Sequence, residues 1–181
     1  MPSDRALIVI DVQHGFEDPS LGPRDNPACE ENIAALIAAW RERGAPIVFV
    51  RHDSGDDFPL TPGTPGNAFK DVIAGEPDLA VVKDVHSAFL GTPDLAAWLR
   101  EREIDAIAIC GITTNHCCET TARMGSDMGY DVSFVLDATH AFDQRDLAGT
   151  TIPAAELARI TASNLDGEFA TVVMTADVIA R

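Results

Sequence analysis

The chain has 181 residues, 46% of them hydrophobic, and its 29 acidic residues outnumber 13 lysines and arginines to give a net charge of −16. This size and apolar content predict that residues 1–181 form a single domain. The negative charge repels nucleic acids and anionic membrane surfaces, so neither is expected as a partner. No apolar run approaches membrane-spanning length and no cleavable leader is recognisable, which predicts a soluble cytoplasmic protein.

Six apolar runs along the chain predict strands. The runs are continuous rather than alternating, which is typical of strands covered by helices on both faces. In chain order they are residues 6–10, 46–50, 79–82, 106–110, 132–136 and 170–174. Helical patterns lie between most of them: one ends at Gly44, one starts at Thr92-Pro93, one starts near Asn115 and one runs from about Pro153 to Leu165. This alternation predicts an α/β fold, a three-layer sandwich around a six-stranded, mostly parallel sheet.

Two long connections interrupt this rhythm, residues 12–27 and 51–78. Both are rich in glycine, proline, aspartate and asparagine, and both exceed the usual length of a connection between a strand and a helix. Loops of this length are usually functional or disordered. Because each follows a predicted strand, both are expected over the carboxyl edge of the sheet, where open parallel sheets bind ligands.

Three chemically reactive side chains follow predicted strands and are expected at this same edge: Asp11, Lys83 and Cys117. Lys83 is one of only two lysines, against eleven arginines, and a compact ammonium suits a buried site beside a thiolate and a carboxylate. Each residue also has a plainer interpretation. Asp11 can be a turn residue, Lys83 can mark a strand end and reach solvent, and Cys117 can be a small buried hydrophobe.

The stretch Gly111–Ala122 predicts a strand end, a tight turn and the first turn of a helix. Backbone N–H groups at a helix start are unpaired and partly positive, so the sulfur of Cys117 is expected there as a stabilised thiolate. Cys118 lies about 100° further round the helix and is expected to pack against the sheet. His116 is expected to point outward. The four cysteines show neither a disulfide framework nor a paired metal-binding spacing, which favours reduced thiols.

Three segments resemble motifs of the isochorismatase-like cysteine hydrolases. Residues 6–13, followed by Gly15-Phe16, resemble that family's first strand with its catalytic aspartate. Residues 83–89 are similar to its lysine motif, K-x-x-x-S-A-F, and residues 111–117 resemble its nucleophile loop. The three motifs occur in the family's order, between residues 6 and 117.

The resemblance implies a Rossmann-like strand order, 3-2-1-4-5-6, and a cysteine-dependent hydrolase of a small-molecule C–N bond, amide or carbamoyl. By this resemblance Asp11 takes the thiol proton, Lys83 orients it and stabilises charge, and Cys117 attacks the carbonyl to form a thioester. The backbone N–H groups of Thr113 and Cys117 would bind the oxyanion, beside a cis peptide bond between Ile112 and Thr113. The implied partners are a small amide or ureido substrate and further copies of the chain, as a dimer or tetramer.

Four further residues are candidates for the substrate pocket. Phe16 and Phe89 fit pocket walls by analogy with the family, although an aromatic side chain near a strand end is as often part of the core. Arg51 and His52 follow the second predicted strand and could contact a polar group of the substrate. Solvated loop residues are an equal alternative for both.

Departures from two branches of the family narrow the expected chemistry. Nicotinamidases carry a metal-binding D-x-H after the second strand, whereas Val50-Arg51-His52 lacks the aspartate, so neither a metal nor another cofactor is expected. Isochorismate hydrolases of the carrier-protein type lack the cysteine that this chain retains. A metal-free C–N hydrolase is therefore favoured. The alternatives are a catalytically silent binding or scaffold protein of the same fold and an isochorismate-type vinyl ether hydrolase.

Two other classes of protein find little support in the sequence. A nucleotide-binding oxidoreductase would share the α/β rhythm, but no G-x-G-x-x-G follows the first predicted strand. A redox sensor could use the adjacent cysteines, yet no resolving C-x-x-C is present.

Overall fold

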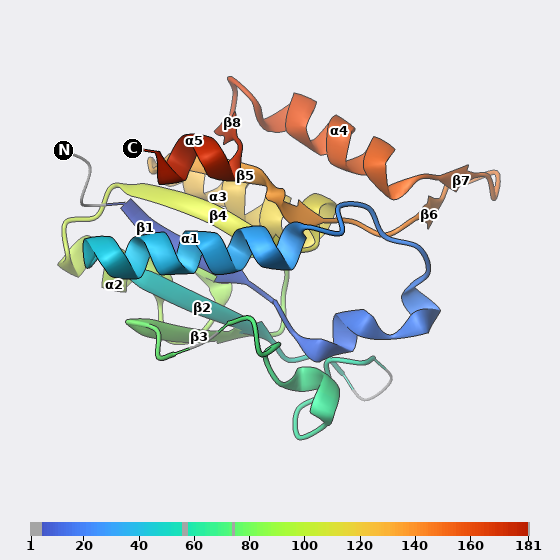
Figure 1. The fold of residues 1–181 in the computed structure, drawn as a ribbon, viewed down its shortest axis with the longest axis horizontal. Coiled ribbons are helices and arrows are strands. Elements are labelled where there is room, and N and C mark those ends of the chain that lie inside the picture. The colour runs from blue at the N-terminus through green and yellow to red at the C-terminus, as the bar shows by residue number, and fades with distance from the viewer. Residues whose placement is uncertain (1–4, 56–57, 74, 181) are drawn as a thin grey trace.

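Six parallel strands form the central sheet of the molecule (Figure 1). The computed structural model describes residues 5–55, 58–73 and 75–180. The strands of the sheet are β1 (Arg5–Ile10), β2 (Ile47–His52), β3 (Leu79–Lys83), β4 (Ala106–Ile112), β5 (Asp131–His140) and β8 (Thr171–Val173). They lie in the order β3-β2-β1-β4-β5-β8, and each neighbouring pair is parallel. Counted along the chain this is the order 3-2-1-4-5-6, so the predicted fold is confirmed.

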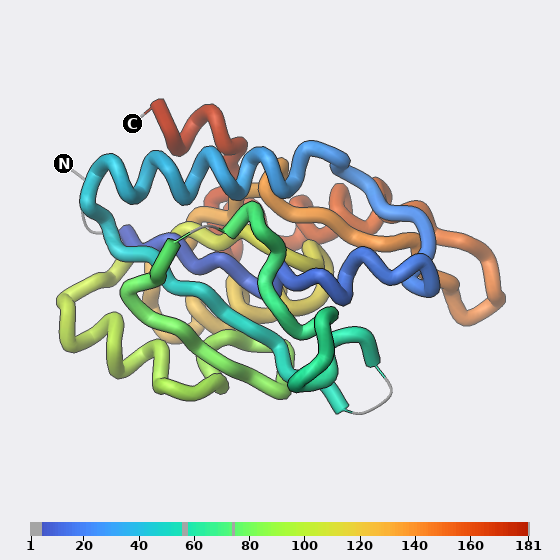
Figure 2. Tube along the Cα trace, turned by 60° about the horizontal axis from the view of Figure 1, so that its bottom comes forward, coloured from blue at the N-terminus to red at the C-terminus, as the bar shows by residue number. Residues whose placement is uncertain are grey.

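Helices cover both faces of the sheet and complete a three-layer α/β sandwich (Figures 1 and 2). One face carries α1 (Cys29–Arg43) and α5 (Thr175–Ile179). The other carries α2 (Leu95–Glu101), α3 (Glu119–Asp127) and α4 (Ala154–Leu165). Among the helices that the structure describes, none is long and apolar enough to cross a membrane.

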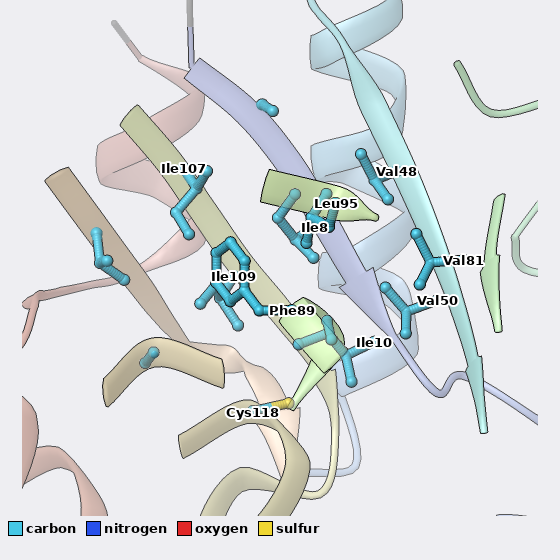
Figure 3. Close-up of a cluster of buried hydrophobic side chains, with 14 of the residues drawn as sticks. Ile8, Ile10, Val48, Val50, Val81, Phe89, Leu95, Ile107, Ile109 and Cys118 are labelled. Atoms are coloured by element: carbon cyan, nitrogen blue, oxygen red, sulfur yellow. The ribbon is translucent and has the colours of Figure 1, made fainter. Parts of the chain in front are cut away.

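The side chains of β1 explain why a central strand reads as one continuous apolar run. Successive side chains of a strand point to opposite faces, so Leu7 packs in the layer of α1. Ile8 packs in the opposite layer, where Figure 3 shows it. Both are fully buried. The two edge strands differ, because Ala80 in β3 and Thr171 in β8 are exposed. A continuous apolar run therefore indicates burial on both faces only in the interior of this sheet.

The predicted helices are present, with shifts at some of their ends. Helix α1 ends directly before Gly44, which adopts the left-handed conformation with φ of 62°. Helix α2 begins at Leu95 rather than at Thr92, because Thr92 exchanges two backbone hydrogen bonds of 2.8 Å with Val82. The side chain of Asp94 then caps the helix by accepting from the N–H of residue 97.

The two long loops contact each other over the carboxyl edge of the sheet. They contain three short 3-10 helices, η1 (His14–Glu17), η2 (Pro19–Leu21) and η3 (Pro65–Asn67). The N–H of Lys70 donates to the carbonyl of Val12 at 2.9 Å, and the two segments run side by side in Figure 2. The sequence pattern does not predict the short antiparallel ribbon formed by β6 (Gln144–Arg145) and β7 (Thr151–Ile152).

Candidate active site

The three reactive side chains predicted to converge do lie together, beyond the carboxyl ends of β1, β3 and β4. The Nζ atom of Lys83 is 2.6 Å from Oδ2 of Asp11 and 3.4 Å from Sγ of Cys117. All three side chains are buried, with exposed fractions of 0% for Asp11, 2% for Lys83 and 7% for Cys117. The ammonium therefore bridges the carboxylate and the sulfur in a nearly solvent-free site.

The backbone directs Asp11 into this site at the point where β1 ends. Its φ is 53°, in the left-handed region, which aspartate tolerates better than most residues. Its N–H donates to the carbonyl of Val50 at 2.9 Å, which anchors it to β2. One carboxylate oxygen, Oδ2, accepts from Lys83, whereas Oδ1 is buried without a hydrogen-bond partner among the described residues. Oδ1 is thus available to accept a proton or a donor from a ligand.

A close approach of backbones sets the path of the chain toward Cys117. Gly111 has φ of 129°, and a Cβ atom there would lie 2.0 Å from the carbonyl oxygen of Ile10, so only glycine fits. The peptide bond between Ile112 and Thr113 is cis, as the family resemblance implies. The following turn, η5 (Thr114–Cys118), is a π-helical turn that leads into α3, rather than the ordinary first turn that the sequence predicts.

The two adjacent cysteines point to different surroundings. Cys118 is fully buried in the apolar core, as expected (Figure 3), whereas Cys117 lines the pocket. Burial, together with the charge of Asp11, raises the pKa of the Cys117 thiol to about 12, against the opposing effect of Lys83. The expectation of a resting thiolate is therefore wrong, because burial and the charge of Asp11 outweigh the effect of Lys83. Burial also raises the pKa of Asp11 above its ordinary value, which Lys83 partly offsets.

These pKa shifts define what the pair can do chemically. Cys117 rests as a thiol, and the Asp11 carboxyl, whose pKa is raised by burial and partly offset by Lys83, binds a proton more readily than an exposed aspartate. The donor atoms of Asp11, His52 and Cys117 all lie within 4.8 Å of one another. The arrangement can thus transfer the thiol proton to the carboxylate over a short distance when a substrate carbonyl is present.

A cavity of about 140 Å³ opens beside Cys117. Its walls are Asp11, Phe16, His52, Phe58, Leu60, His86, Thr113, His116 and Cys117. Of the four predicted pocket residues, the structure brings Phe16 and His52 to the cavity. Arg51 points away from the cavity, because neighbouring residues of a strand point to opposite faces. Its Nε donates to Oδ1 of Asp53 at 3.0 Å instead. Phe89 is buried in the core, stacked on Tyr130 with ring centroids 5.4 Å apart.

Several pocket residues were not identified from the sequence. His116 is exposed, as expected, but its ring also lines the cavity, and partial burial lowers its pKa. Its ring lies 6.2 Å from that of His86, and its Nε2 is 3.1 Å from Nε2 of Gln144. His86 lies within the lysine motif at 83–89, so the motif itself was an available signal. Phe58 and Leu60 come from a long loop with no pattern that marks them.

The trio of Asp11, His52 and Cys117 also has the spacing of metal ligands. Lys83 occupies the position between the three residues. Its Nζ lies 2.6 Å from Oδ2 of Asp11, 2.9 Å from Nδ1 of His52 and 3.4 Å from Sγ of Cys117. A metal ion at this point would have to displace an ammonium group from three partners. The donor set of this chain therefore suits a lysine better than a metal.

Comparisons with known proteins agree over nearly the whole chain. A family model described as the isochorismatase domain matches residues 5–164. The isochorismatase family protein YrdC of Bacillus subtilis is 37% identical over 181 residues, covering 99% of this chain and 96% of YrdC. A crystal structure of a protein of the isochorismatase family from Chromobacterium violaceum has a TM-score of 0.93 and 37% identity, covering 98% of this chain and 93% of that chain.

Three further similarities concern proteins whose names state an activity. The crystal structure of a cysteine hydrolase from Pseudomonas syringae pv. phaseolicola has a TM-score of 0.89 and 31% identity, covering 99% of this chain and 92% of that chain. Ureidoacrylate amidohydrolase RutB of Cronobacter sakazakii is 31% identical, covering 77% of this chain and 75% of RutB. Nicotinamidase 3 of Arabidopsis thaliana is 31% identical, covering 77% of this chain and 74% of that protein.

Proposed function

The chain belongs to the isochorismatase family of hydrolases, and from this membership and the geometry of its pocket we propose that it hydrolyses a C–N bond of a small amide or carbamoyl compound. The reaction passes through a thioester at Cys117. The observation that carries the proposal is the buried Lys83 ammonium, which bridges Asp11 and the sulfur beside an open cavity. The names of the amidohydrolase and nicotinamidase relatives support the amide bond as the target.

The reaction follows from the protonation states of the free site. Asp11 takes the proton of the Cys117 thiol as the sulfur attacks the carbonyl carbon, and the Lys83 ammonium stabilises the thiolate charge that develops. The tetrahedral adduct collapses, the C–N bond breaks, and the proton held by Asp11 leaves with the amine. Water then attacks the thioester, with Asp11 as its base, to release a carboxylic or carbamic acid and restore the thiol.

The oxyanion of each tetrahedral adduct needs hydrogen-bond donors that are fixed in advance. The backbone N–H groups of Thr113 and Cys117 are the proposed donors, and both residues line the cavity. Removal of one such donor in other hydrolases slows the reaction about 100-fold to 1,000-fold. The adjoining strand end, with Gly111 pressed against β1, holds this turn in place.

The size and chemistry of the cavity support a small, uncharged acyl group. A volume of about 140 Å³ is close to that of a cavity that holds one benzene molecule, roughly 150 Å³. Among the described residues that form its walls there is no arginine and no lysine to pair with a carboxylate. This favours a neutral amide over the diacid of a vinyl ether hydrolase. A silent scaffold protein would have no need of the buried charges at Asp11 and Lys83.

The proposed setting is the cytoplasm, with the chain assembled as a dimer or tetramer. All four cysteines are free and buried, which supports a reducing compartment. The mouth of the cavity is formed by two long loops, and a second copy of the chain would give them support. Symmetric dimers are the commonest arrangement of soluble homo-oligomers.

A screen of small neutral amides and ureido compounds, with released amine or ammonia as the signal, tests this function. Cys117→Ala should abolish hydrolysis because it removes the nucleophile. Cys118→Ala, the matched control at the neighbouring buried position, should retain most of it. Equal losses in the two variants, or an active Cys117→Ala enzyme, would refute the assignment of the nucleophile.

A further inference from the structure

The Lys83 ammonium has a third partner in addition to the two that the proposed reaction uses. Its Nζ lies 2.9 Å from Nδ1 of His52, closer than to the sulfur of Cys117. The two residues are direct partners in the register between β2 and β3. An ammonium carries three N–H donors and no acceptor, so Nδ1 must accept this hydrogen bond. The proton of a neutral His52 ring is then on Nε2.

The chain holds His52 by its backbone as well. The buried side chain of Gln13 grips the residue from both sides: its Oε1 accepts from the His52 N–H at 2.8 Å, and its Nε2 donates to the His52 carbonyl at 2.9 Å. The Nδ2 of Asn67 donates to the same carbonyl at 3.1 Å. A residue fixed in this way cannot drift from the ammonium without breaking several buried hydrogen bonds.

We propose that His52 is a positioning residue whose Nδ1 holds the Lys83 ammonium against Asp11 and Cys117, and whose Nε2–H is presented to the substrate. The second half of this statement rests on the proposed amide hydrolysis, whereas the first half concerns the free protein. Among the described residues, Nε2 of His52 makes no hydrogen bond, and the ring lines the cavity. With all three N–H donors of Lys83 satisfied, the ammonium cannot swing toward the free Oδ1 of Asp11.

The electrostatic surroundings keep the ring in the neutral form that this role needs. Burial and the adjacent Lys83 lower the pKa of His52 to about 4, so Nδ1 carries a lone pair at neutral pH. The charged and titratable groups around the ring are Lys83, His86, Asp53, Asp84, Asp11 and Cys117. Of these, Asp53 and Asp84 oppose the shift but do not overcome it.

The rate of alkylation of Cys117 by iodoacetamide tests the positioning role without any substrate. The other three cysteines are fully buried, and Cys117→Ala gives their background. His52→Phe and His52→Leu remove the acceptor, which frees the ammonium to leave the sulfur. We expect the alkylation rate at one fixed alkaline pH to fall about tenfold or more in both, a factor that corresponds to about 1.4 kcal/mol. Two apolar variants are used so that, if one fails to fold, the other still tests the role of His52.

His52→Asn is the matched variant, because its Oδ1 is as many bonds from Cα as Nδ1 of histidine and can accept from Lys83. In this variant Cys117 should be alkylated at a rate within about threefold of the parent's, which corresponds to well below 1.4 kcal/mol. The neighbouring Arg51→Leu, whose side chain points away from the cavity, should alkylate like the parent. A parental rate in His52→Phe and His52→Leu, or an Asn variant as slow as these, would overturn the positioning role.

Hydrolysis of an accepted amide tests the second half. His52→Asn keeps the Lys83 contact but lacks Nε2–H, so its kcat/KM should fall by about tenfold while its alkylation rate is retained. An Asn variant with parental kcat/KM would overturn the role of Nε2–H as a donor to the substrate. If alkylation responds to His52 but no amide is hydrolysed, the positioning role stands and the proposed function fails. The two proposals are therefore refuted by different results.

Discussion

His140, at the end of β5, should make the protein sensitive to mild acid. Its side chain is fully buried, and neither ring nitrogen has a hydrogen-bond partner among the described residues. Burial lowers its pKa to about 4, assisted by the positive charges of Arg24 and Lys70 and opposed by Glu30. The His140 ring also packs edge-on against the ring of Phe142, with ring centroids 5.1 Å apart. Protonation inside this site is therefore much harder than in the unfolded chain.

The magnitude follows from the two pKa values of the same group. An unfolded histidine titrates near pH 6.5, roughly 2.5 units above the folded value. Above about pH 6.5 the His140 ring is neutral in both the folded and the unfolded state, and the full stability is present. As the pH falls from about 6.5 to about 4, the ring binds a proton in the unfolded state but not in the folded state. Stability is lost across this window. Between about pH 7 and about pH 5 the loss from His140 alone is about 2 kcal/mol.

Urea unfolding at the two pH values measures this loss directly. Half-buried His52 and other groups also titrate, so the comparison is between the parent and non-titrating variants at His140. His140→Leu and His140→Gln should each lose about 2 kcal/mol less than the parent between about pH 7 and about pH 5. This difference should hold whatever stability each variant has at neutral pH. Variants as acid-sensitive as the parent would show that His140 does not titrate as its burial implies.

Three further predictions concern the buried charges, the metal and the assembly. Asp11→Asn and Lys83→Met should each abolish hydrolysis and cost about 3 kcal/mol of stability, because each leaves one buried charge unpaired. In urea unfolding the double variant should regain stability, but it should remain inactive. An active single variant would contradict the mechanism. Exhaustive chelation should leave the rate unchanged, since Lys83 holds the centre of the ligand trio, and activity that needs added zinc or iron would refute this. Light scattering at micromolar concentration should find a dimer or tetramer; a fully active monomer would refute the expected assembly.

The fold was predictable because its signals are local in the sequence. Each central strand is an apolar run, and an alternation with helical patterns permits few topologies. Asp11, Lys83 and Cys117 were identifiable because each follows such a run, and because three motifs resemble one family. The apolar runs predict that the edge strands are also covered on both faces, because the sequence does not show which strands form the edges of the sheet. Ala80 and Thr171 are exposed because they lie in these edge strands.

The details of the pocket depend on register and burial, which the sequence does not show. Lys83 reaches His52 because the two are paired across β2 and β3, and shifting that register by one residue would point the ring to the other face. Phe89 was assigned to the pocket by analogy, but its 3-10 helix turns it into the core. The protonation of Cys117 depends on desolvation, and only the structure reveals that the sulfur is almost sealed from water.

The central claim is that a thioester forms on Cys117, and mass spectrometry of the protein during turnover tests it most directly. An amide whose acyl-enzyme hydrolyses slowly is mixed with the enzyme and quenched in acid, and the intact and digested protein are weighed. We predict a mass increase equal to the acyl group, located on the peptide that contains Cys117 and absent from Cys117→Ala. Steady hydrolysis with no such adduct, in an enzyme whose Cys117→Ala variant remains active, would contradict the account.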